Sequence, residues 1–166
     1  MLICVRKKKL ITSKSAVPTP SKAPPRRLVR IPSGMPSQMT INDPKIMAEL
    51  RALYPRYEEA LVNNDVDTLM TMFWAGPQVM RFGAAENLYG PEELEAFRKA
   101  RPTANLARTV TRLDIVSFGR DFASVTLEFE RAAGGGIVRG RQSQVWVRMP
   151  EGWRIVQAHV SLLPRA

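Results

Sequence analysis

The chain has 166 residues, enough for one ordinary domain and a tail, and 45% of them are hydrophobic. Its formal charge of +10 would suggest nucleic-acid binding, but nine of the 25 basic residues and none of the acidic ones lie in residues 1–38, so the remainder is nearly neutral. The single cysteine, Cys4, excludes an intrachain disulfide, and no apolar run reaches the ~18 residues of a membrane span. We therefore expect a cytoplasmic protein that binds neither nucleic acid nor membrane.

Residues 1–38 are predicted to be a disordered basic arm, and residues 39–166 a folded domain. Five prolines fall between Pro18 and Pro32, and such a segment cannot bury enough apolar surface to offset the entropy of ordering it. Three explanations of the arm stay open: sequence upstream of a later start at Met35 or Met39, a targeting peptide, or a tether for nucleic acid or an anionic surface.

Helices are predicted in the first half of the domain. Asn42-Asp43-Pro44 is a typical helix start, and apolar residues at helical spacing extend from Ile46 to Leu61, with the end near Asn63. Pro55 lies inside this helix and should kink it or remove one hydrogen bond. Asp65 can cap a second, short helix. A short strand is predicted over 77–83, followed by a third helix that begins at Pro91 and stops before Pro102.

Strands are predicted in the second half, where the apolar period changes to two. The runs 108–118, 122–131, 137–149 and 153–163 are rich in Val, Ile, Thr and Phe and are separated by glycine-containing turns. Helices followed by an antiparallel meander indicate an α+β fold, with the helices laid on one face of the sheet.

Strand alternation suggests a polar group on the concave face of this sheet. Arg141 and Ser143 share one face of their strand, as His159 and Ser161 do of theirs, and buried polar groups need a partner or a ligand. Alternatively, Arg141 faces solvent, together with Arg139, and His159 is a core histidine.

Three further side chains are candidates for the same pocket. Tyr57, on the apolar face of the first helix, is either a core tyrosine or a proton donor, and Arg81 either faces solvent or grips a carboxylate. Trp74 is either core or a wall of the pocket. Glu86, Asn87 and Tyr89 are predicted to lie in a loop, where functional residues gather.

Recognised catalytic motifs are missing from the sequence. It contains no H-E-x-x-H, P-loop, dinucleotide-binding or G-x-S-x-G motif, and its one histidine excludes a multi-histidine metal site. We therefore expect any catalysis to use Arg, Tyr, His and Ser without a cofactor or metal.

Six motifs in order resemble the AtzH/HpxZ family of the SnoaL-like, nuclear-transport-factor-like superfamily. They span about residues 42–163 and read Y-P-R-Y-E (54–58), F-W (73–74), R-F-G-x-x-E-N-L-Y-G (81–90), F-R-x-x-R-P (97–102), G-R-Q-x-Q-x-W-V-R (140–148) and G-W-R-x-x-x-A-H-V-S (152–161). The resemblance implies a cystatin-like cone, in which a curved antiparallel sheet wraps on helices, a pocket at the mouth of the cone, and a homodimer.

The resemblance also implies a reaction. AtzH is a decarboxylating amidohydrolase of cyanuric acid catabolism that converts 1,3-dicarboxyurea to allophanate, and its catalytic tyrosine and arginine match Tyr57 and Arg81. The other candidates, Trp74, Arg141, Ser143, His159 and Ser161, would bind the substrate. Alternatively, the chain is a non-catalytic member that binds a small acid or associates with an amidase-signature hydrolase in oxalurate and purine catabolism.

Overall fold

The structure, a computed structural model, describes residues 39–104 and 106–164, so the predicted arm at residues 1–38 lies outside the described residues. No helix in the described part is long and apolar enough to cross a membrane. Its elements follow one another in the order α1 (Pro44–Asn63), α2 (Val66–Met72), β1 (Met80–Phe82), β2 (Asn87–Tyr89), α3 (Gly90–Ala100), β3 (Thr109–Phe118), β4 (Phe122–Ala133), β5 (Gly136–Met149) and β6 (Gly152–Leu162).

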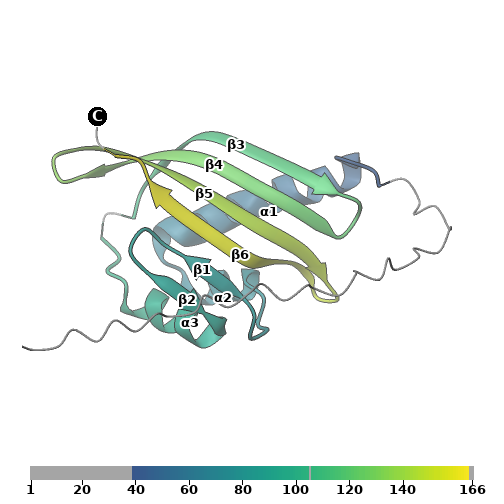
Figure 1. Cartoon of the computed structure of the whole chain (residues 1–166), viewed down its shortest axis with the longest axis horizontal. Helices are drawn as coiled ribbons and strands as arrows, with labels where there is room; N and C mark the ends of the chain where they lie inside the picture. The colour runs from purple at the N-terminus through teal and green to yellow at the C-terminus, as the bar shows by residue number, and fades with distance from the viewer. Residues whose placement is uncertain (1–38, 105, 165–166) are drawn as a thin grey trace, which may run out of the picture. The chain divides into compact units, whose positions relative to one another are not determined.

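The strands form one six-stranded sheet in the order β2-β1-β6-β5-β4-β3, with α1 laid across one face of the long strands (Figure 1). Strands β3 to β6 are the predicted antiparallel meander. The predicted α+β cone fold is therefore confirmed. The sheet is not purely antiparallel, however, because β1 runs parallel to β6 and pairs Arg81 with Ala158.

Strand β2 corrects the sequence prediction, which placed Asn87 and Tyr89 in a loop. These residues pair antiparallel with β1 and leave Glu86 in the turn between the two strands. A strand of three residues is too short to show alternation, so its existence depends on the neighbouring strand rather than on its own pattern.

The helices begin where the sequence predicts. The Asp43 carboxylate accepts hydrogen bonds from the backbone N–H groups of Lys45 (2.9 Å) and Ile46 (3.4 Å), so the first turn of α1 is capped. Asp65 accepts a hydrogen bond from the Thr68 N–H at 3.0 Å and caps α2 in the same way. Helix α1 continues through Pro55 and buries one face, which includes Tyr57, against the sheet.

A β-bulge in β6 decides which side chains face the helices. Val145 pairs with Gln157 but the next residue, Trp146, pairs with Ile155, so β6 has one extra residue at Val156. The alternation of side chains that points inward before the bulge therefore points outward after it. Trp153 and Ile155 point inward before the bulge, and Ala158 does so after it.

Candidate functional site

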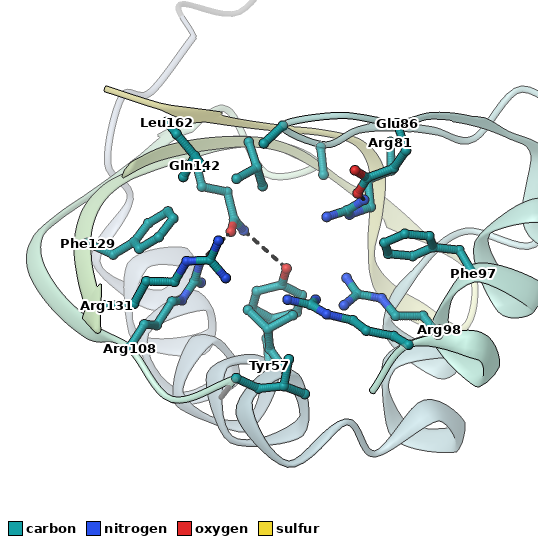
Figure 2. A pocket seen from close by; sticks show the side chains of 16 residues that line it. Tyr57, Arg81, Glu86, Phe97, Arg98, Arg108, Phe129, Arg131, Gln142 and Leu162 are labelled. Atoms are coloured by element: carbon teal, nitrogen blue, oxygen red, sulfur yellow. Dashed lines mark hydrogen bonds and ion pairs between the residues drawn. The ribbon is translucent and has the colours of Figure 1, made fainter. Parts of the chain in front are cut away.

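A cavity of about 180 Å³ lies between α1, β1, α3 and the inner face of strands β4 to β6. Tyr57 projects into it from α1 (Figure 2). Five arginines also contribute to the lining: Arg81, Arg98, Arg101, Arg108 and Arg131. A small space between helices and a curved sheet is thus surrounded by an unusual concentration of positive charge.

Regular secondary structure brings three of these arginines to the cavity. Arg81 is the middle residue of β1 and the one buried residue of that strand. Arg98 lies on the buried face of α3, and Arg131 is on the inward-facing side of β4. Arg101 and Arg108 come from the connection between α3 and β3. The cluster therefore combines residues that are far apart in the sequence.

Two of the five guanidinium groups are paired with carboxylates. Arg81 Nη1 lies 2.5 Å from Glu86 Oε1. Arg108 makes a bidentate ion pair with Glu58, in which Nε donates to Oε1 at 2.6 Å and Nη2 donates to Oε2 at 2.7 Å. The other three arginines of the lining form no ion pair within the described residues. Three positive charges at the cavity are therefore not balanced by an acidic partner.

In each ion pair, the opposite charge shifts the pKa of one member toward its charged form. Burial alone would raise the pKa of Glu86, but the hydrogen bond and the charge of Arg81 outweigh it and lower that pKa. Burial alone would lower the pKa of Arg108, but the hydrogen bond to Glu58 outweighs it and raises that pKa. Glu86 and Arg108 are thus charged at neutral pH.

Arg98 is buried without a partner for its guanidinium group. Its exposed fraction is 1%, and neither Nη1 nor Nη2 has a hydrogen-bond partner. Burial lowers the pKa of Arg98 to about 10, so the group still carries its charge at neutral pH. A buried cation with unused donors requires an acceptor, and the cavity is the place from which a ligand can provide one.

A second unbalanced cation has like charges around it. Burial lowers the pKa of Arg101, and the positive charges of Arg81 and Arg131 lower it further. Arg131 also has a buried Nε without a partner. Mutual repulsion among these groups makes the cavity a favourable site for an anion.

Tyr57 places its hydroxyl group among these cations. Its exposed fraction is 2%, and its ring packs edge-on against Trp146 with centroids 6.3 Å apart. The hydroxyl oxygen accepts a hydrogen bond from Gln142 Nε2 at 3.1 Å. The phenol is therefore fixed by packing and by one hydrogen bond, which leaves its proton for another acceptor.

The structure brings two of the predicted site residues together, Tyr57 and Arg81, in one cavity lining. Trp74 is only half-buried and lies outside this lining, with its ring over Gly76. The expectation that four other residues line the pocket is wrong, because none of them contributes to it: Arg141, Ser143, His159 and Ser161.

Two physical reasons account for this error. On β5 the inward side carries Gln142, Gln144 and Trp146, so Arg141 and Ser143 point outward. On β6 the bulge reverses the alternation after Ile155, so His159 is exposed. The alternative interpretation is therefore right for Arg141, which faces solvent, and wrong for His159, which is not a core histidine. The ring of His159 contacts Phe82 edge-on instead, with centroids 6.1 Å apart.

Sequence reasoning missed five polar residues of the lining: Arg98, Arg101, Arg108, Arg131 and Gln142. A signal existed for three of them. Arg98 follows the apolar Leu94 by one helical turn, and Arg131 and Gln142 occupy strand positions with the parity of buried neighbours. Arg101 and Arg108 lie in an irregular segment, where no periodicity shows the direction of a side chain.

Comparison with known families and structures agrees with the fold described above. The model of the AtzH-like family matches residues 39–166. A crystal structure of a protein of unknown function from the DUF3225 family of Pectobacterium atrosepticum is 48% identical, with a TM-score of 0.72, and the match covers 75% of this chain and 95% of that one.

Two other solved structures extend the comparison. A cystatin-like fold protein from Burkholderia xenovorans is 39% identical over 77% of this chain and 99% of its own, with a TM-score of 0.71. A nuclear transport factor 2-like protein from Salmonella enterica is 21% identical over 74% and 94%, with a TM-score of 0.61, and shows likeness of fold alone. The search of curated proteins found no match.

Proposed function

Because the chain belongs to the AtzH-like family, we propose that it binds a small N-carboxylated urea, 1,3-dicarboxyurea, and removes one carboxylate as CO₂ to give allophanate. The observation that carries this proposal is the excess of guanidinium charge around the Tyr57 hydroxyl group. The reaction needs a site that holds a dianion and delivers one proton.

The charge of the cavity fits a dianion better than a neutral or singly charged ligand. Three of the five arginines have no acidic partner in the described residues, and guanidinium groups bind carboxylates with two parallel hydrogen bonds. A volume of about 180 Å³ is below the roughly 300–1,000 Å³ of pockets for drug-sized ligands, so it suits a compact molecule.

The arginines also lie on both sides of the proton donor. Arg81 and Arg98 are on one side of the Tyr57 hydroxyl, whereas Arg108 and Arg131 are on the other (Figure 2). A urea with a carboxylate at each end can place one carboxylate in each group. Its nitrogens then lie between the two groups, near the phenol.

The chemical step follows from this placement. The bond between a urea nitrogen and its carboxylate carbon breaks, CO₂ leaves without charge, and the electron pair stays on nitrogen. Tyr57 donates its proton to that nitrogen, and solvent later returns a proton to the phenolate. The substrate loses one negative charge in this step, so the product has one carboxylate fewer to hold it among the arginines.

The test is a turnover assay with the full chain and freshly generated 1,3-dicarboxyurea, following allophanate above the uncatalysed rate. Tyr57→Phe should lower turnover by about 10²–10⁴-fold, the usual contribution of a general acid. Tyr89→Phe is the matched control, because this tyrosine is exposed and outside the cavity. Arg81→Met and Arg141→Met form a second pair, in which the first arginine lines the cavity and the second is exposed.

The results separate catalysis from binding. Turnover by the wild-type chain that is lost in Tyr57→Phe and kept in Tyr89→Phe supports the proposal. Folded wild-type protein that binds the dianion without accelerating its decay would reject the enzyme and leave a protein that binds small acids, a function that the unpaired donors of Arg98 also favour.

A further inference from the structure

A chain of hydrogen bonds connects the Tyr57 hydroxyl to a buried ion pair. Arg108 binds Glu58 through Nε and Nη2, and its remaining Nη1 donates to Gln142 Oε1 at 2.9 Å. Gln142 Nε2 then donates to the Tyr57 oxygen at 3.1 Å. The side chains of Glu58, Arg108, Gln142 and Tyr57 thus form one continuous network across α1, the segment before β3, and β5.

The chemistry of the donors gives this network a direction. A guanidinium group has only donors, so Arg108 must face the carbonyl oxygen of the Gln142 amide. The NH₂ of the same amide then faces Tyr57, whose oxygen has to accept. An amide flip, which often leaves such orientations open, would place NH₂ against guanidinium and is excluded here.

Burial makes this direction hard to reverse. Gln142 and Tyr57 are each 2% exposed, so a misdirected donor would lose a hydrogen bond without gaining one from water. The guanidinium of Arg108 is also held over the Phe129 ring, 4.6 Å from its centroid. Tyr54 donates to Glu58 Oε2 at 3.0 Å and fixes the carboxylate at the far end of the network.

We propose that Glu58, Arg108 and Gln142 are positioning residues that keep the Tyr57 oxygen as an acceptor toward the sheet and so direct its proton into the cavity. Within the described residues Tyr57 donates no hydrogen bond, so the proton is available to a ligand. This inference deepens the proposed function and rests on it only in the experiments that measure turnover. The orientation itself can be tested without any reaction.

The first experiment measures that orientation by NMR in the full-length protein labelled with ¹⁵N-glutamine. The side-chain amide protons of Gln142 should show nuclear Overhauser contacts to the Tyr57 ring, and Tyr57→Phe should shift the amide resonance because it removes the acceptor. Gln144 is the internal control, since its carbonyl oxygen accepts from Trp146 Nε1 and its amide lies outside the network. Absence of contacts between the Gln142 amide and the ring would overturn the proposal, whether or not the wild type has activity.

The second experiment reverses the direction of the network. Gln142→Glu replaces the donating NH₂ by an oxygen, so Tyr57 would donate its proton to the carboxylate introduced at this position instead of to the cavity. Gln142→Met removes the donor without adding an acceptor. We expect Gln142→Glu to lower turnover about tenfold or more below Gln142→Met. Equal turnover in the two folded variants would refute a role in directing the proton.

The third experiment separates positioning from structural support. Glu58 does not line the cavity, and its charge opposes an anionic ligand, so Glu58→Gln should lower kcat without raising KM. Glu59→Gln is the matched control at the next, exposed position of α1. A rise in KM together with a fall in kcat would indicate a merely structural role and contradict the proposal. If the wild type has no turnover, the proposed function fails and the NMR contacts alone decide this inference.

Discussion

Replacing Arg98 by methionine should make the ligand-free protein more stable and should weaken the binding of an anion in the cavity. The guanidinium is buried at 1% exposure and has no partner for Nη1 or Nη2. Methionine keeps an unbranched side chain and a similar helix propensity, but it has no charge to desolvate. The substitution therefore removes a penalty that the protein carries in the absence of ligand.

The size of this penalty follows from the pKa of Arg98. Burial lowers that pKa from the ordinary value of an arginine to about 10, which at 1.36 kcal/mol per pH unit is about 3 kcal/mol against the charged form in the folded state. The folded-state pKa lies below the unfolded-state value, so the penalty is fully present at neutral pH and would be relieved only as the pH rises above about 10. Replacing buried ion pairs by packed apolar residues is often neutral or stabilises proteins by about 1–4 kcal/mol. Arg98 has no partner whose charge would be left behind, so we expect about 1–3 kcal/mol of stabilisation for Arg98→Met.

Denaturant unfolding of the full chain with and without malonate, an inert dicarboxylate, measures both effects. A ligand at one hundred times its Kd stabilises the wild type by about 2.7 kcal/mol, whereas Arg98→Met should gain much less. Lys99→Met is the control on the same helix, because the ammonium group is exposed. The reasoning is refuted if Arg98→Met unfolds more easily than the wild type without ligand, or if malonate stabilises both proteins equally.

Two further predictions concern acid stability and packing. Although burial opposes it, Arg81 lowers the pKa of Glu86 below its ordinary value, so their ion pair stabilises the protein at neutral pH and is lost as the pH falls through the lowered pKa. Glu86→Gln should therefore show a smaller loss of stability in acid-unfolding curves at fixed ionic strength. Gly140→Ala places a Cβ 2.2 Å from the Phe129 ring and should lower the free energy of unfolding by about 1–3 kcal/mol in denaturant titrations, whereas Gly136→Ala, with nothing within 4 Å, should not.

Much of the fold could be predicted because its signals are local. Asp43 and Asp65 cap their helices with side chains that bond to the following backbone N–H groups, which requires only neighbouring residues. The four long strands lie within a few residues of the predicted runs, because glycine-containing turns separate clear stretches of β-branched residues. Strand β2 was missed because three residues carry no period of their own.

The pocket-facing side of the last strand could not be predicted, because its bulge depends on pairing with β5. Trp153, Ile155 and Val156 are all apolar, so the sequence is compatible with either face after Ile155. The extra residue becomes visible only in the register, where Val145 pairs with Gln157 and Trp146 with Ile155. A shift of one residue moved His159 from the expected pocket to the exposed face.

The residues that break the local rules are the ones that build the cavity. Arg98 occupies a buried helix position, Arg131 continues the inward side of an apolar strand, and Gln142 lies two residues before a buried glutamine and four before Trp146. Each would weaken an ordinary core, so their convergence on one small space is what the proposed binding of an anion would require at the expense of stability. The Arg98→Met experiment tests this directly, since a protein shaped only for stability would have no unpaired cation whose removal makes it more stable.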